Sequence, residues 1–233
     1  PVDCIHPKKD DPKFAGNGYQ LRQGYTVMWS GWQGDLIYQG TNVVAYLPEA
    51  KLNGLPLRGT IRQEFIAAAP NVLSMGVSAG AEGGANVHPY PVVDRGTATL
   101  TVRRREQDQR LPVPAGQWEL AKAETKDGQV LLTPSNIHLH VKGGFKPGWI
   151  YEFIYETEGS RVMGLGFLGI RDLIAAIKHA QADSFGNPNP LAGSLDKVYG
   201  YGASLSGRVI RQYVYEGWNQ DADGRRLFDA ASP

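Results

Sequence analysis

The chain has 233 residues and a formal net charge of +1, so it carries no excess of positive charge for binding nucleic acid or an anionic membrane. Hydrophobic residues make up 42% of it, which is ordinary for a globular protein, and no apolar run approaches the roughly 18 residues that cross a bilayer. The single cysteine, Cys4, excludes an internal disulfide framework and leaves the compartment open.

The first region, residues 1–35, is predicted to hold one strand of a parallel sheet. The run Gly24 to Trp29 is rich in aromatic and β-branched residues, as in a strand that is covered on both faces. Trp29 and Trp32 flank a glycine at its carboxyl end, where ligands bind in open α/β sheets. We therefore expect these two rings to line a substrate pocket, and the alternative is that they pack against the next region.

The second region, residues 36–148, is predicted to be rich in β-strands and to pair them in sequential antiparallel order. Asn53-Gly54 is a strong turn signal, which we expect to join the strands at 41–47 and 57–66, and Asp127-Gly128 is another. The expected strands have alternating or β-branched sequences and lie at 41–47, 57–66, 97–102, 118–123, 130–133 and 137–141. The basic run Arg103 to Arg105 is interpreted as a solvated strand end.

The third region, residues 149–233, is predicted to be of the α/β type. Tyr151 to Tyr155 alternates like a strand, and apolar residues from Phe167 to Ile177 recur at helical spacing. An irregular loop follows around Asn187 to Pro190. A short strand, 198–201, then leads through a glycine-rich turn to a second helix, which ends near Gly217.

The turn between that strand and helix contains Ser204, the candidate nucleophile. It lies in Gly202-Ala203-Ser204-Leu205-Ser206, and small residues two positions away are what a sharp strand-to-helix turn requires. In a serine hydrolase the backbone N–H of the next residue, Leu205, donates a hydrogen bond to the oxyanion. We expect Ser204 to be a better candidate than Ser206, because Arg208 would occupy the small position two residues after Ser206.

The acid and the histidine of a catalytic triad are not found at the positions in the sequence that a serine hydrolase of this type requires. In α/β-hydrolases the acid and the histidine follow the serine in the sequence. Only 29 residues follow Ser204, and none of them is histidine, since the last histidine is His179. Asp221, Asp223 and Asp229 follow the turn too closely for a triad acid. The sequence therefore predicts a fragment that stops before its triad is complete and that is inactive alone.

Two patterns resemble metal sites and fall short of one. His138 and His140 would share one face of a strand, but two ligands do not complete a site. The segment 219–224 imitates the start of a calcium loop, whose required glutamate falls on Ala230. We expect a turn built from Asx-type hydrogen bonds there, and neither a metal nor a cofactor.

The chain resembles a family of large bacterial α/β-hydrolase domain proteins. The resemblance rests on segments that follow one another in the same order, namely 29–35, 164–172, 189–191, 202–208 and 217–229. It implies a partial α/β-hydrolase fold with a β-rich insertion, and a serine esterase or lipase that is longer than this chain. The family has Gln and Gly where Leu205 and Ala230 stand here.

The function expected from these residues is hydrolysis of a small-molecule carboxylic ester through an acyl-enzyme on Ser204. The alternative is a non-catalytic binding module with a vestigial turn. On that view, exposed aromatic residues of the β-rich region, such as Trp118 and Trp149, would contact a sugar or a polymer.

Overall fold

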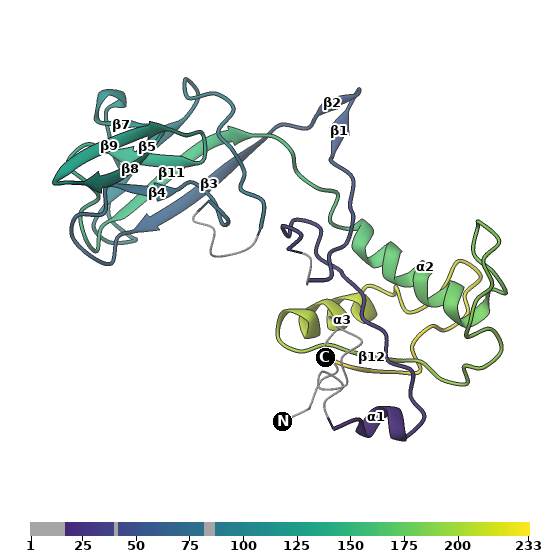
Figure 1. The fold of residues 1–233 in the computed structure, drawn as a ribbon. Helices are drawn as coiled ribbons and strands as arrows, with labels where there is room; N and C mark the ends of the chain where they lie inside the picture. The colour runs from purple at the N-terminus through teal and green to yellow at the C-terminus, as the bar shows by residue number, and fades with distance from the viewer. Residues whose placement is uncertain (1–16, 40–41, 82–86) are drawn as a thin grey trace. The chain divides into compact units, whose positions relative to one another are not determined.

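The computed structural model describes residues 17–39, 42–81 and 87–233, and these form two compact units (Figure 1). We call residues 35–37 and 48–161 the sheet unit. We call the described parts of 1–34, 38–47 and 162–233 the helical unit.

In its described residues, the sheet unit contains four small sheets, and all their strand pairings are antiparallel. The sheet orders are β3-β11-β5-β6, β4-β10-β7, β8-β9 and β1-β2. The strands are β1 (Lys51–Leu52), β2 (Leu55–Pro56), β3 (Gly59–Ile66), β4 (Ser74–Gly76), β5 (Thr99–Arg103), β6 (Leu111–Pro112), β7 (Trp118–Glu119), β8 (Ala121–Lys126), β9 (Gln129–Pro134), β10 (His138–Val141) and β11 (Ile150–Thr157), and a 3₁₀ turn, η2, covers Ala115–Gln117.

The core of the sheet unit forms against one face of β11. Its side chains alternate between the two faces of the sheet, so Tyr151, Phe153 and Tyr155 are all turned inward and buried. The Phe153 ring stacks on Tyr155 with 5.1 Å between centroids and meets Trp118 edge-on at 5.5 Å. Aromatic packing of this kind therefore joins two different sheets of the unit.

The described part of the helical unit contains one parallel strand pair, which is connected through a helix. Its elements are α1 (Tyr19–Arg22), α2 (Leu165–His179), β12 (Tyr199–Tyr201), α3 (Leu205–Tyr215) and β13 (Ala230–Ser232). In the register of the pair, Tyr199 lies opposite Ala230 and Tyr201 opposite Ser232. A core of Ile170 and Ile174 from α2 with Tyr213 from α3 packs on Leu227 and Phe228.

The fold class expected from the sequence, a partial α/β-hydrolase, is wrong. Among the described residues there are three α-helices, and the strands form several small sheets that are antiparallel except for β12-β13. An α/β-hydrolase core needs a continuous, mostly parallel sheet with helices on both faces. The expectation came from one strand-turn-helix segment, which is present, and was extended to segments that pair differently.

The predicted parallel strand from Gly24 to Trp29 is not a strand. No described strand pairs with it, and Tyr25, Met28 and Trp29 are each nearly half exposed. Aromatic and β-branched residues favour a strand only when neighbouring strands supply hydrogen bonds and a packed surface. The described part of 41–47 is not a strand either, and the Asn53-Gly54 turn connects β1 to β2 instead.

The prediction that the strands pair in sequential order is wrong for two sheets, since β3 pairs with β11 and β10 lies between β4 and β7. Several local predictions are confirmed. Asp127 and Gly128 have φ of 52° and 76° and form the tight turn between β8 and β9. The helix expected around Phe167 to Ile177 is α2, and Gly217, at φ 81°, follows the end of α3. The strand expected at Tyr151 to Tyr155 is β11, which pairs with β3 and β5 in the sheet unit.

Candidate functional site

Ser204 occupies the junction between β12 and α3 with an unusual backbone conformation. Its φ is 56° and its ψ is −118°. For a residue with a side chain, such a conformation costs about 1–3 kcal/mol of free energy. It persists only where the surrounding structure enforces it. Strained residues of this kind concentrate at active sites, so the conformation marks Ser204 as a functional candidate.

Close packing of the backbone enforces this turn. A Cβ atom on Gly202 would lie 2.4 Å from the carbonyl oxygen of Ser206, so only glycine fits there. The Gly202 N–H donates to the Ser232 carbonyl of β13 at 3.0 Å. The parallel strand pair and the start of α3 therefore hold Ser204 from both sides.

The hydroxyl group of Ser206 is hydrogen-bonded within the turn itself. Its O–H donates to the Ala203 carbonyl at 2.8 Å, and its Oγ accepts the Ala203 N–H at 3.1 Å. Ser204, by contrast, is exposed and makes no side-chain capping bond to α3. The two serines thus have separate roles, and Ser204 is the one whose hydroxyl can meet a substrate.

Leu205 provides a backbone donor beside Ser204. It is the first residue of α3, where N–H groups have no carbonyl one turn earlier to bind. The positive end of the helix dipole adds to the attraction for a developing negative charge. Its side chain is 57% exposed, so the Leu205 position is open to solvent.

The two tryptophans expected to line a pocket lie in the helical unit and differ in environment. Trp29 is 46% exposed. Trp32 packs against the core of the helical unit. A Cβ atom on Gly166 of α2 would lie 2.9 Å from the Trp32 carbonyl oxygen, so α2 approaches Trp32 closely. Trp32 thus has a packing role, and a pocket role for either ring stays a prediction.

The aspartates after α3 have structural roles. Asp221 accepts hydrogen bonds from the backbone N–H groups of Asp223 and Arg225, which confirms the predicted Asx-type turn. Asp229 accepts from the Val198 N–H and from the Lys178 ammonium. These two donors hold the pKa of Asp229 below its ordinary value, and they tie the start of β12 to α2.

No histidine of the described chain bonds to the turn at Ser204. His88, His138 and His140 belong to the sheet unit, and His179 ends α2 in the helical unit. The Nδ1 atom of His140 donates to the Leu73 carbonyl at 2.8 Å, since a carbonyl can only accept. The described residues also contain no group of three or more His, Cys, Asp or Glu side chains that could hold a metal ion.

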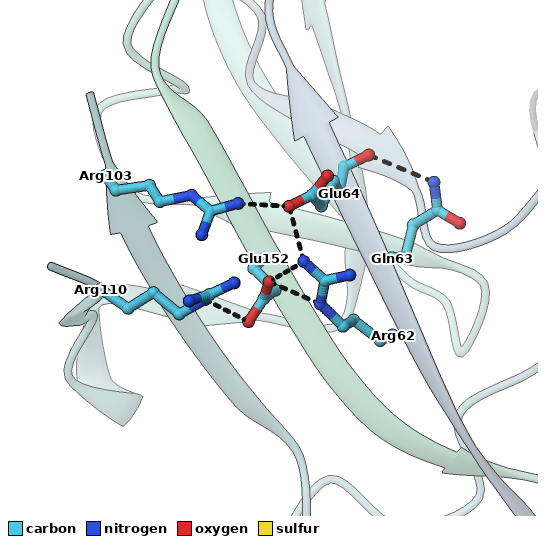
Figure 2. A network of polar contacts seen from close by, with 6 residues as sticks. All are labelled: Arg62, Gln63, Glu64, Arg103, Arg110 and Glu152. Carbon is cyan, nitrogen blue, oxygen red and sulfur yellow. Dashed lines mark hydrogen bonds and ion pairs between the residues drawn. The ribbon is translucent and has the colours of Figure 1, made fainter. Parts of the chain in front are cut away.

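A charged network on the face of the sheet opposite the core was missed by the sequence analysis (Figure 2). Glu152 of β11 accepts from Arg62 Nε at 2.6 Å and from Arg110 Nε at 2.9 Å. Glu64 of β3 accepts from Arg62 at 2.8 Å and from Arg103 at 2.6 Å. The network connects three neighbouring strands, and Arg103 is 4% exposed, so the prediction of a solvated strand end is wrong for Arg103.

Burial and ion pairing act on Glu152 in opposite directions. Burial by itself raises the pKa of the Glu152 carboxyl. The hydrogen bonds from Arg62 and Arg110 outweigh burial, and the pKa lies below its ordinary value. Each carboxylate is shared between two guanidinium groups, which fits a structural role in the sheet.

The exposed aromatic surface expected for a binding module is absent at Trp118. Its side chain is 3% exposed, and the Arg95 guanidinium lies 4.5 Å from the ring centroid. Trp149 is half-buried with the Lys146 ammonium 4.9 Å from its ring. Trp118 therefore cannot stack on a sugar, and the alternative function loses that support.

Two hollows in the sheet unit are formed by residues far from the turn in sequence. The larger, about 560 Å³, is lined by residues of β3 and β4 and their neighbours. The smaller, about 310 Å³, is lined in part by Asp35, His88 and Arg161. Ser204 lines neither hollow.

No protein-family model, no curated protein and no solved structure matches this chain. The resemblance to bacterial α/β-hydrolase domain proteins therefore stays a prediction. Among the described residues, no helix is both long enough and apolar enough to cross a membrane.

Proposed function

We propose that this protein is a serine hydrolase that cleaves carboxylic esters with Ser204 as its nucleophile. The observation that carries the proposal is the backbone of Ser204, at φ 56° and ψ −118°, between a strand and a helix. The exposed position of Ser204 and the Leu205 N–H at the start of α3 support the same chemistry.

In the proposed reaction, Ser204 Oγ attacks the ester carbonyl carbon and its proton passes to a general base. The Leu205 N–H donates to the carbonyl oxygen as negative charge develops there. The alcohol leaves with a proton, and water then hydrolyses the acyl-serine ester. The proposal assigns the nucleophile and one oxyanion donor. The general base is proposed to be a histidine, and no histidine is among the described hydrogen-bond partners of the turn.

A fluorophosphonate probe tests the proposal, because it forms a covalent bond only with an activated serine. We expect the full-length protein to carry the label on the peptide that contains Ser204. Ser204→Ala should abolish labelling while the thermal unfolding temperature stays close to that of the unsubstituted protein.

Ser135→Ala is the matched control. Ser135 Oγ lies 2.9 Å from His138 Nδ1, so this serine already contacts a histidine in the described structure. This variant should label normally. A folded protein that takes no label, or that takes it on another serine, would show that Ser204 is not an activated nucleophile.

A further inference from the structure

Strand β9 presents an apolar, uncharged edge in the sheet unit. All six of its residues, Gln129–Pro134, are exposed, and Val130, Leu131 and Leu132 are 51%, 49% and 41% exposed. In the described part of the chain β9 pairs with β8 alone. Exposed strand edges are normally protected by charge, twist or a covering element, because they readily pair with another chain.

The contacts of β8 show which backbone groups of β9 point outward. Ala123 lies opposite Leu132, yet the Ala123 N–H donates to Ser74 Oγ at 2.9 Å on its other side. Ala123 and Leu132 are therefore a pair without mutual hydrogen bonds, and the N–H and C=O of Leu132 point away from β8. The alternation of antiparallel pairing gives Val130 the same orientation.

We propose that β9 is a self-association surface, on which β9 of a second copy of this chain pairs antiparallel. A two-fold axis at Leu131 places Val130 opposite Leu132 of the second copy, and Leu132 opposite its Val130. Both positions have an outward N–H and an outward C=O, so this register forms four hydrogen bonds. The two Leu131 residues then face each other as a pair without mutual hydrogen bonds.

The backbone pattern and the absence of charge on β9 favour a second copy of the chain in this register. A two-fold axis at Leu132 would place Val130 opposite Pro134, which has no N–H to donate. The strand carries no charge, so two copies meet without like charges opposite each other. The paired segment is short, and the dimer is therefore weak and dependent on concentration.

Disulfide trapping tests the register. In a Cys4→Ser background, Leu131→Cys should form a disulfide-linked dimer on mild oxidation, because residues paired in this way have Cα atoms roughly 4.5 Å apart. Gln129→Cys should not, because it faces position 133 of the second copy. Equal trapping of both variants would overturn the proposed pairing.

Sedimentation equilibrium tests the interface itself on the protein as its gene encodes it. Leu131→Lys places two like charges opposite each other and should raise the dimer dissociation constant about tenfold or more. Leu52→Lys is the matched control, since Leu52 is a 63% exposed leucine in the β1-β2 hairpin, and it should leave the constant unchanged. A protein that stays monomeric, or equal dissociation constants for both variants, would refute the proposal.

Discussion

At the scale of single residues, Ser204 and Ser206 show how the backbone assigns different tasks to identical side chains. The Ser206 hydroxyl is bonded twice to Ala203 and closes the turn. The Ser204 hydroxyl is exposed on a strained backbone beside a helix N-terminus. Ser206 thus maintains the geometry that the proposed function requires of Ser204.

The requirement for glycine at position 202 can be tested by unfolding. Gly202→Ala places a methyl group against the Ser206 carbonyl and should lower the free energy of unfolding by about 1–3 kcal/mol. Gly169→Ala is the matched control, because a Cβ there has open space on α2. It should be neutral or stabilise by about 0.5–1 kcal/mol. Urea unfolding measures both, and equal effects would mean that the turn relaxes around alanine at little cost.

At the scale of elements, the charged network joins β3, β11 and β5 on the face of the sheet away from the core (Figure 2). Glu152 has a side chain only 5% exposed and pairs with Arg62 and Arg110, which come from opposite sides of β11. The two arginine side chains are about half exposed, so the buried charge that depends on this pairing is the Glu152 carboxylate, which would be left uncompensated without them.

This pairing predicts how stability depends on pH. The folded-state pKa of Glu152 lies below its unfolded value of about 4.3, so the carboxylate stabilises the fold fully above that pH. The contribution is lost as the pH falls through the lower folded-state pKa. Glu152→Gln should therefore cost about 1 kcal/mol or more at pH 7, and the difference from the unsubstituted protein should shrink in acid.

The control for this prediction is Glu124→Gln, because the Glu124 side chain is 65% exposed and pairs with a single lysine on the surface. Its effect on the free energy of unfolding at pH 7 should be smaller than that of Glu152→Gln. Urea unfolding at several pH values measures both variants. A Glu152→Gln penalty that stays constant down to pH 3 would contradict the assigned role.

At the scale of the whole molecule, each unit has its own hydrophobic cluster. The cluster of the sheet unit surrounds Phe153, which is fully buried, and the cluster of the helical unit includes Ile174 and Tyr213. Buried apolar contacts are the main source of stability within a unit, so each cluster should govern the opening of its own unit.

Amide hydrogen exchange can test this assignment. Phe153→Ala should destabilise by about 3–5 kcal/mol and accelerate exchange in β3, β5 and β11. Amides of α2 and α3 should keep their rates. Ile174→Ala should have the reverse pattern, with a cost of about 2–5 kcal/mol. Uniform acceleration across both units by either variant would show that they unfold as one cooperative body.

The sequence by itself determined the elements that depend on neighbouring residues. The Asp127-Gly128 turn, the helix α2 and the strand-turn-helix at Ser204 each follow from residue types within a short segment. Local backbone preferences and side-chain periodicity act over that range. The candidate nucleophile could therefore be predicted from five residues.

Only the tertiary structure decided which strands pair and which side chains are buried. Gly24 to Trp29 has the sequence of a strand, but no strand in the described part of the chain pairs with it, and Arg103 and Trp118 are buried by residues distant in sequence. Arg62 and Glu152, for example, are 90 residues apart. Strand pairing, burial and the strained backbone of Ser204 all depend on such distant contacts, which composition and periodicity do not specify.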